Sequence, residues 1–149
     1  MLEFAVEPLT PALIEEIVPI QDRYWQETEG HYKKRAARPA WPIYMVAQNN
    51  GMLKAVIARS DGKVVGGAMV LVTEDPFCAC VLGAVSLIYL LPEYRNGWNG
   101  IKIAKMAISQ AKSAGAEFIT AQTCLHNGTD KIFRHLGFNE YAKSLLMEV

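Results

Sequence analysis

The chain has 149 residues, of which 51% are hydrophobic, and its 15 Lys and Arg residues balance 15 Asp and Glu residues. This length and apolar content predict one domain, residues 1–149, with a sizeable core. The formal net charge of zero gives no field that would attract nucleic acid or an anionic membrane. No apolar run is long enough to cross a bilayer and the N-terminal residues lack a signal-peptide pattern, so we expect neither nucleic acid nor a membrane as partner.

The three cysteines, Cys78, Cys80 and Cys124, are odd in number and not spaced as a disulfide framework. We therefore expect reduced thiols and a cytoplasmic protein. His126 lies near Cys124 in the sequence, which raises the question of a zinc site. A Cys-x-Cys pair on a strand lacks the usual spacer of two to four residues between ligands, so no bound metal is expected.

The first half of the chain is expected to contribute a strand, helical segments and a β-hairpin. In chain order these are a strand over residues 3–7, a helix from residue 10, loop and short helix over 29–42, a short helix over 43–47, and strands over 53–59 and 64–73. Thr10 and Pro11 are typical of a helix start, whereas Pro19 is expected to kink or interrupt that helix. Ser60-Asp61-Gly62-Lys63 is a strong hairpin signal.

The second half is expected to alternate strands and helices. In chain order these are a central strand over 81–91, a helix over 101–114, a strand over 118–123, a short helix that ends at Gly137, and a final strand over 142–149. The 101–114 helix has the clearest apolar stripe in the chain, and Gly115 closes it. Hairpin strands followed by a strand–helix–strand unit predict the α/β class, with a mixed central sheet and helices on both faces.

The most informative segment is Leu87–Gly100, LIYLLPEYRNGWNG. Its apolar run is typical of a buried strand that stops at Pro92, which cannot donate a ladder hydrogen bond. Gly97 and Gly100 let the backbone approach a ligand closely, and a helix follows at about Ile101. Free N–H groups and the positive end of the helix dipole then point at one spot, which favours an anion, most often a phosphate.

Two common phosphate motifs do not fit this segment. A P-loop needs Gly-Lys-Ser/Thr at the end of the turn, and here Gly100 is followed by Ile101. The dinucleotide fingerprint needs G-x-G-x-x-G and an acidic residue at the end of the next strand. Only G-x-x-G is present, and Glu117 falls at the start of the next apolar run. A nucleotide-binding domain of another kind therefore ranks last among the functions considered.

What fits is the pyrophosphate turn of the GNAT superfamily of acyl-CoA N-acetyltransferases. Pro92-Glu93-Tyr94-Arg95 and the following Asn96–Gly100 resemble that family's strand–turn–helix pattern, Arg-x-x-Gly-x-Gly/Ala. One departure is that Trp98 stands where the family usually has its first motif glycine, with Gly97 one place earlier. The resemblance covers Lys54–Phe138.

A later segment supports the same resemblance. Asn127–Phe138 resembles the family's helix that ends in Leu-Gly-Phe after an upstream Asn. Thr129 is expected to be the N-cap of this helix, and Gly137 suits the left-handed position after its end. The resemblance implies a central mixed sheet with helices on both faces, as the element order does.

The resemblance also implies a function: transfer of an acetyl group from acetyl-CoA to a primary amine by direct attack. In that family the turn holds the pyrophosphate, and the strand before it pairs with the pantetheine arm. A backbone N–H near Ile88 or Leu90 would stabilise the oxyanion of the thioester. The residues expected to bind this co-substrate are Ile88, Leu90, Arg95, Asn96, Gly97, Trp98, Asn99, Gly100, Ile101, Asn127 and Phe133.

Proton transfer has no single obvious candidate. Many family members have Tyr four residues before the Gly of Gly-Phe as general acid for the thiolate, and here Phe133 occupies that position. His126 is the substitute that we select, because it follows the strand over 118–123 and histidine exchanges protons near neutral pH. The alternative is an ordinary loop histidine. Tyr89 and Cys124 are further candidates, each with core packing as the alternative. The general base stays open, and a water relay is compatible with the sequence.

The acceptor amine, a small molecule or a protein, is not specified by the sequence. The resemblance implies that the early part of the chain borders the acceptor pocket, where a loop carrying aromatic residues could grip a substrate. Four aromatic residues lie in this part, Trp25, Tyr32, Trp41 and Tyr44, and core packing is expected for at least two of them. The basic run Lys33-Lys34-Arg35, with Arg38 after it, is interpreted as a solvated face. A rival function is a degenerate acetyltransferase fold that binds CoA or a protein partner, and Phe133 is the reason to consider it. The apolar final strand could pair with a second copy to form a homodimer.

Overall fold

The computed structural model describes all 149 residues as one five-stranded sheet with four α-helices. The strands are β1 (Leu2–Val6), β2 (Leu53–Ser60), β3 (Lys63–Glu74), β4 (Val81–Leu90) and β5 (Phe118–Ala121). The helices are α1 (Pro11–Glu27), α2 (Trp41–Asn49), α3 (Asn99–Ser113) and α4 (Asp130–His135). Two 3-10 helices, η1 (Glu29–His31) and η2 (Pro92–Tyr94), follow α1 and β4.

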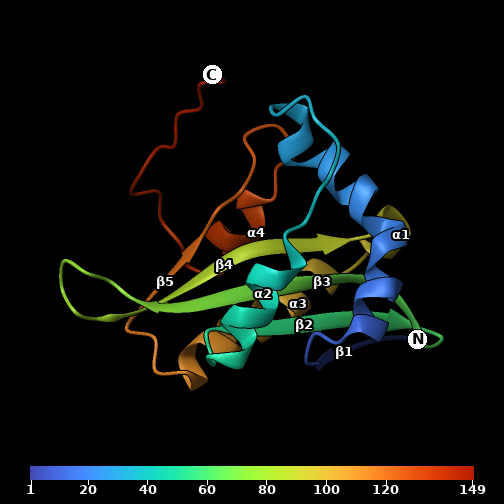
Figure 1. Ribbon diagram of the computed structural model, residues 1–149, viewed down its shortest axis with the longest axis horizontal. Coiled ribbons are helices and arrows are strands. Elements are labelled where there is room, and N and C mark those ends of the chain that lie inside the picture. The colour runs from blue at the N-terminus through green and yellow to red at the C-terminus, as the bar shows by residue number, and fades with distance from the viewer.

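The five strands lie in chain order, and all neighbours are antiparallel except β4 and β5, which are parallel. Helices α1 and α2 cover one face of the sheet, and α3 and α4 cover the other (Figure 1). Strand β2 supplies both cores, because Val56 and Ala58 pack on the α3 side whereas Ala55 and Ile57 pack on the α1 side. The predicted mixed sheet with helices on both faces is confirmed.

Strands β4 and β5 separate part of the way along their length. They pair only from Leu82 to Val85, and β5 ends at Ala121. The β3–β4 register shifts after Met69, which leaves Ser86 as an extra residue in β4. Such a bulge bends a strand locally. Beyond Ser86, the side of β4 that faced β5 therefore has no neighbouring strand.

Helix α1 begins where the sequence predicts it. The Thr10 hydroxyl accepts a hydrogen bond from Leu13 N at 3.1 Å, so Thr10 is the N-cap. Pro19 lies inside α1 without ending it, so of the two expected effects, a kink or an interruption, the interruption does not occur. A proline removes one hydrogen bond of the helix. Packing of Ile17 and Ile20 against the sheet, on both sides of Pro19, keeps both halves helical.

The final strand expected over 142–149 does not form. Residues 139–149 are in neither helix nor strand and make no backbone hydrogen bond. Residues 145–147 are three consecutive apolar residues, a run without the alternation that gives a strand one buried face. The tail is held instead by an ion pair from Glu148 to Arg35 at 3.0 Å. The strand on which the pairing of two copies was predicted is therefore absent.

The expectation of reduced cysteines is wrong for two of the three, because Cys78 and Cys80 form a disulfide. They lie in the turn between β3 and β4 rather than on a strand. Ala79 between them has a φ of +52°, and Ala79 N donates to Asp75 O at 2.8 Å, so the chain folds back on itself there. This tight turn brings the two side chains together. Cys124 is a free cysteine.

Candidate active site

The N-terminal end of α3 presents a row of unpaired backbone donors. Five N–H groups in this region make no hydrogen bond within the protein, and they belong to Asn96, Gly97, Trp98, Gly100 and Ile101. No side chain caps this helix. Because these donors lie at the positive end of the helix dipole, the turn is suited to bind an anion such as a phosphate group.

Side-chain hydrogen bonds hold this turn in shape. Asn99 Nδ2 donates to Tyr94 O at 3.0 Å and to Asn96 Oδ1 at 3.1 Å. Gly97 has a φ of +55°, a left-handed conformation that favours glycine. Gly97, which stands one place earlier than the glycine of the family pattern, therefore lies where the backbone conformation calls for a glycine. The Trp98 side chain, in the next position, is 65% exposed.

The backbone of β4 is open on one side beyond its bulge. Leu91 N donates to Val65 O at 2.9 Å, across to β3. Successive residues of a strand direct their backbone groups to alternate sides, so Ile88 and Leu90 direct theirs to the side that β5 does not reach. Leu90 O already accepts from Arg95 Nε at 2.7 Å. Ile88 keeps both backbone groups for an extended ligand that binds as an added strand.

A small cavity lies where β4 and β5 separate. Its volume is about 40 Å³, and its wall includes Ile88, Gln122, Cys124 and Asn127. Asn127 Oδ1 accepts a hydrogen bond from Thr129 N at 3.2 Å, just before α4. Thr129 occupies the N-cap position, but its own side chain makes no capping bond, contrary to the expectation. Burial raises the pKa of the Cys124 thiol, so this thiol stays protonated near neutral pH.

Phe133 is part of the core beneath the turn. It is 3% exposed, and its ring packs edge-on against Phe138 with 5.2 Å between centroids. Its neighbour Ile132 lies against the start of α3, where a Cβ added to Gly100 would come within 2.9 Å of the Ile132 Cδ1. Phe133 lines neither of the two cavities described here. Its place in the structure is to pack α4 against the sheet and α3.

One carboxylate, Glu27 at the end of α1, joins α1 to β4 and to the turn. Its Oε1 accepts from the Tyr89 hydroxyl at 2.8 Å, and its Oε2 accepts from Arg95 Nη2 at 2.5 Å. The Arg95 guanidinium also lies over the Tyr89 ring, 5.0 Å from its centroid. Burial, and next the hydrogen bond to Glu27, raise the pKa of Tyr89 to about 12. Because Arg95 pairs with Glu27, its positive charge is already compensated within the protein.

His126 is fixed through both ring nitrogens. Its Nε2 lies 2.9 Å from Glu27 O, and its Nδ1 lies 2.9 Å from the Tyr32 hydroxyl. A carbonyl oxygen only accepts, so Nε2 carries the proton of the neutral ring and Nδ1 accepts from Tyr32. The ring stacks on His31 with 4.1 Å between centroids. His126 itself lines neither cavity, but Tyr32 lines the larger one.

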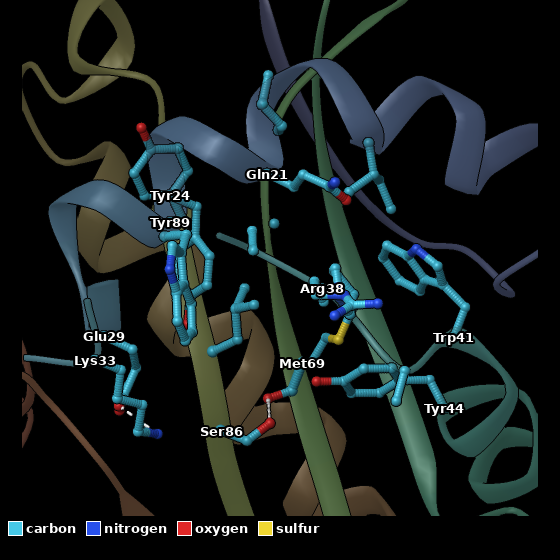
Figure 2. A pocket seen from close by; sticks show the side chains of 18 of the residues that line it. Gln21, Tyr24, Glu29, Lys33, Arg38, Trp41, Tyr44, Met69, Ser86 and Tyr89 are labelled. Atoms are coloured by element: carbon cyan, nitrogen blue, oxygen red, sulfur yellow. Dashed lines mark hydrogen bonds and ion pairs between the residues drawn. The ribbon is translucent and has the colours of Figure 1, made fainter. Parts of the chain in front are cut away.

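The larger cavity lies on the α1–α2 face of the sheet and has a volume of about 930 Å³. Figure 2 shows aromatic side chains on two sides of it, with Tyr24 and Tyr89 facing Trp41 and Tyr44 across the strands. The four early aromatic residues, Trp25, Tyr32, Trp41 and Tyr44, all belong to its wall. Trp41 and Tyr44 also pack against the core on this face, as expected for two of the four. The last residues of the tail, 146–149, complete the wall.

Sequence reasoning missed Glu27 and the tail. A signal for Glu27 was present, because a carboxylate at the C-terminal end of a helix is unfavourable there unless a cation pairs with it. The tail gave no such signal.

In the whole structure no group of three or more His, Cys, Asp or Glu residues is placed to hold a metal ion. None of the helices has the length and hydropathy of a membrane span.

Comparisons with known proteins agree with this geometry. The sequence matches the model of the acetyltransferase (GNAT) family over residues 14–138. A comparison with curated proteins finds no match. Among solved structures, a ribosomal-protein-alanine N-acetyltransferase from Brucella melitensis biovar Abortus 2308 has a TM-score of 0.75 at 17% identity, with 100% of both chains covered.

Two further structures share the fold. A transcriptional regulator from Bacillus halodurans C-125 has a TM-score of 0.78 at 16% identity, with 99% of this chain and 100% of that chain covered. AAC(6')-Iy, in complex with the bisubstrate analogue CoA-S-monomethyl-acetylneamine, has a TM-score of 0.70 at 16% identity. That match covers 100% of this chain and 98% of the other.

At such low identities the structural likeness establishes the fold, whereas the family model spans most of the chain and establishes the family. The unpaired donors at the start of α3 are suited to an anionic group, and the open edge of β4 is suited to an extended ligand. The chain belongs to the acetyltransferase (GNAT) family and is an acyl-CoA-dependent N-acetyltransferase.

Proposed function

We propose that the protein transfers an acetyl group from acetyl-CoA to a primary amine, which attacks the thioester directly. The observation that carries this proposal is the row of five unpaired N–H groups at the start of α3, next to a β4 edge without a partner strand. Ser86, Leu87 and Tyr89 of the same strand line the large cavity. The co-substrate at the open edge of β4 and the acceptor in the large cavity would therefore meet at this strand.

Acetyl-CoA supplies the acetyl thioester, and groups of this chain hold it. We assign the pyrophosphate to the N–H groups of Asn96–Ile101 and the pantetheine amides to the backbone of Ile88. A backbone N–H of Ile88 or Leu90 is suited to stabilise negative charge on the thioester oxygen. The remaining predicted residues act indirectly: Arg95 ties the turn to Glu27, while Asn127 and Phe133 position α4 beneath it.

For the proton of the attacking amine, we assign a path from Tyr32 to His126. Tyr32 lines the cavity and its hydroxyl donates to His126 Nδ1, so a proton given up to Tyr32 passes on to an imidazole at the protein surface. Tyr89 is the candidate donor to the leaving thiolate. Its hydroxyl keeps its proton near neutral pH, because its pKa is raised to about 12.

An amine as acceptor agrees with the names of two structural neighbours. One is a ribosomal-protein-alanine N-acetyltransferase, and the other was solved with CoA-S-monomethyl-acetylneamine. Those names leave open a small molecule or a protein as the acceptor of this chain. A cytoplasmic location stays a prediction from the sequence.

Thermal unfolding with added ligand tests the co-substrate first. A ligand that binds only the folded state adds about 2.7 kcal/mol to the free energy of unfolding at a hundred times its dissociation constant. We expect acetyl-CoA and CoA to raise the melting temperature, and ATP and NAD to leave it unchanged. Release of free CoA in the presence of amines then tests transfer. Binding of CoA without release on any amine would contradict the transfer and favour a binding protein.

A further inference from the structure

The large cavity has a wall of two kinds. Apolar side chains dominate it, from helices α1 and α2 on one side and from the sheet on the other; they include Ile17, Ile20, Trp41, Tyr44, Met69 and Leu71. Charged side chains come from η1, from the segment between η1 and α2, and from the tail. An acceptor bound here must therefore have an apolar surface, and the charged side chains of the wall determine which charged groups it carries.

The charges of this wall are mostly already paired. Glu29 binds Lys33 at 2.8 Å, and Glu148 binds Arg35 at 3.0 Å. Arg38 is the remaining charged side chain of the wall, and it makes no ion pair and no hydrogen bond. Arg38 is exposed to solvent and belongs to the wall, and in the view of Figure 2 its side chain lies between those of Trp41 and Tyr44. The charge that the cavity offers to a ligand is thus positive.

One polar group of the wall lacks a partner as well. Gln21 Oε1 is buried and accepts no hydrogen bond. Gln21 extends from α1 in Figure 2 and lines the same cavity as Arg38. An unpaired buried acceptor is costly. A bound molecule that brings a hydrogen-bond donor would therefore be favoured once the Gln21 side chain turns towards that donor.

We propose that the acceptor is an amine that also carries an apolar body and a carboxylate, as a hydrophobic amino acid does, and that Arg38 binds the carboxylate. This inference rests on the proposed acetyl transfer to an amine and adds the class of acceptor. The guanidinium and a carboxylate form a bidentate pair, which fixes orientation as well as charge. The aromatic residues hold the apolar body. Polycationic amines are disfavoured, because both carboxylate side chains of the wall are already paired.

The test measures binding of a pair of acetylated products, so it does not require turnover. N-acetylphenylalanine and N-acetylphenethylamine differ only in the carboxylate. We expect calorimetry in the presence of CoA to show the first bound at least tenfold more tightly by the wild type. Arg38→Gln should bring this ratio close to one. Lys34→Gln, a matched change in the same basic run but outside the cavity wall, should keep the wild-type ratio.

Each other outcome overturns the inference. Equal binding of the two products by the wild type, binding of neither, or a ratio that Arg38→Gln leaves unchanged would exclude Arg38 as the carboxylate site. A CoA-release assay with phenylalanine, phenethylamine, spermidine and kanamycin adds a second readout, and preference for the polycations would exclude the class. Failure of acetyl-CoA to bind is seen separately in the same calorimeter and would refute the proposed function, while the product ratio still decides the chemistry of the cavity.

Discussion

The Glu27 carboxylate accepts a hydrogen bond from the Arg95 guanidinium at 2.5 Å, which joins the last residue of α1 to the turn before α3. The other oxygen of Glu27 accepts from the Tyr89 hydroxyl, in the wall of the large cavity. One side chain therefore supports both the turn assigned to the pyrophosphate and the wall assigned to the acceptor.

The first prediction concerns this carboxylate. Glu27→Gln keeps an acceptor for Tyr89 but removes the charge that pairs with Arg95. The pair is partly exposed to solvent, so we expect a loss of about 1 kcal/mol in the free energy of unfolding, measured by urea denaturation. Glu15→Gln on the exposed face of the same helix is the control and should change stability little. Equal stability of the two variants would contradict the role of Glu27.

The second prediction separates strain from ligand binding. Gly97 has a φ of +55° and Gly115, at the other end of α3, a φ of +86°. An added Cβ would meet nothing within 4 Å at either position, so Gly→Ala should cost about 1 kcal/mol of stability at both. Only Gly97→Ala should also weaken acetyl-CoA binding, by about tenfold, which is about 1.4 kcal/mol. Calorimetry that finds the same loss of affinity in both variants would exclude Gly97 from the site.

The sequence was informative wherever a feature is local. The turn after β4 and the hairpin between β2 and β3 are short segments whose residues determine their own backbone, and both were predicted. The pair of Glu27 and Arg95 joins residues 68 apart, and the pair of Tyr32 and His126 joins residues 94 apart. Spacing in a single sequence carries no information on such contacts. His126 could therefore be chosen as a candidate, whereas its partner Tyr32 could not be assigned to it.

The predicted secondary structure differs from the observed one where tertiary packing outweighs local preference, or where a predicted strand finds no neighbouring strand to pair with. Pro19 favours a kink or a break in the helix, and the break does not occur because the apolar side chains on both sides of it hold α1 against the sheet. Residues 142–149 are apolar enough for a strand, yet they pair with no strand edge, and the last four of them line the cavity instead. In both cases the outcome depends on the tertiary contacts and not on the segment alone.

The third prediction tests the proton path with a matched pair of histidines. His126→Ala removes the group that accepts from Tyr32, so turnover should fall by roughly a hundredfold while the dissociation constant of acetyl-CoA stays the same. His31→Ala removes the ring that stacks on His126 and packs edge-on against Tyr32, but no hydrogen bond of the path, and should leave turnover within a few-fold of the wild type. Tyr32→Phe should resemble His126→Ala, because it interrupts the same path. An unchanged rate in His126→Ala would eliminate this role.

The fourth prediction concerns alkaline pH. The pKa of Tyr89 is raised to about 12, first by burial and then by Glu27, and burial raises the pKa of Tyr24 to about 12. A tyrosine of the unfolded chain titrates near pH 10, so the folded protein holds these protons more tightly. Their contribution to stability is complete below about pH 10 and is lost as the pH rises from about 10 to about 12.

Replacement of one of these tyrosines tests the cause of that loss. Tyr89→Phe removes one titrating group, so its free energy of unfolding should fall less steeply than that of the wild type between pH 10 and 12. Tyr141→Phe is the control, since Tyr141 is 83% exposed and should leave the slope unchanged. Urea denaturation at intervals from pH 8 to 12 measures both slopes. Parallel curves for Tyr89→Phe and the wild type would show that Tyr89 titrates alike in the folded and unfolded chains, and would assign the alkaline loss of stability to other groups.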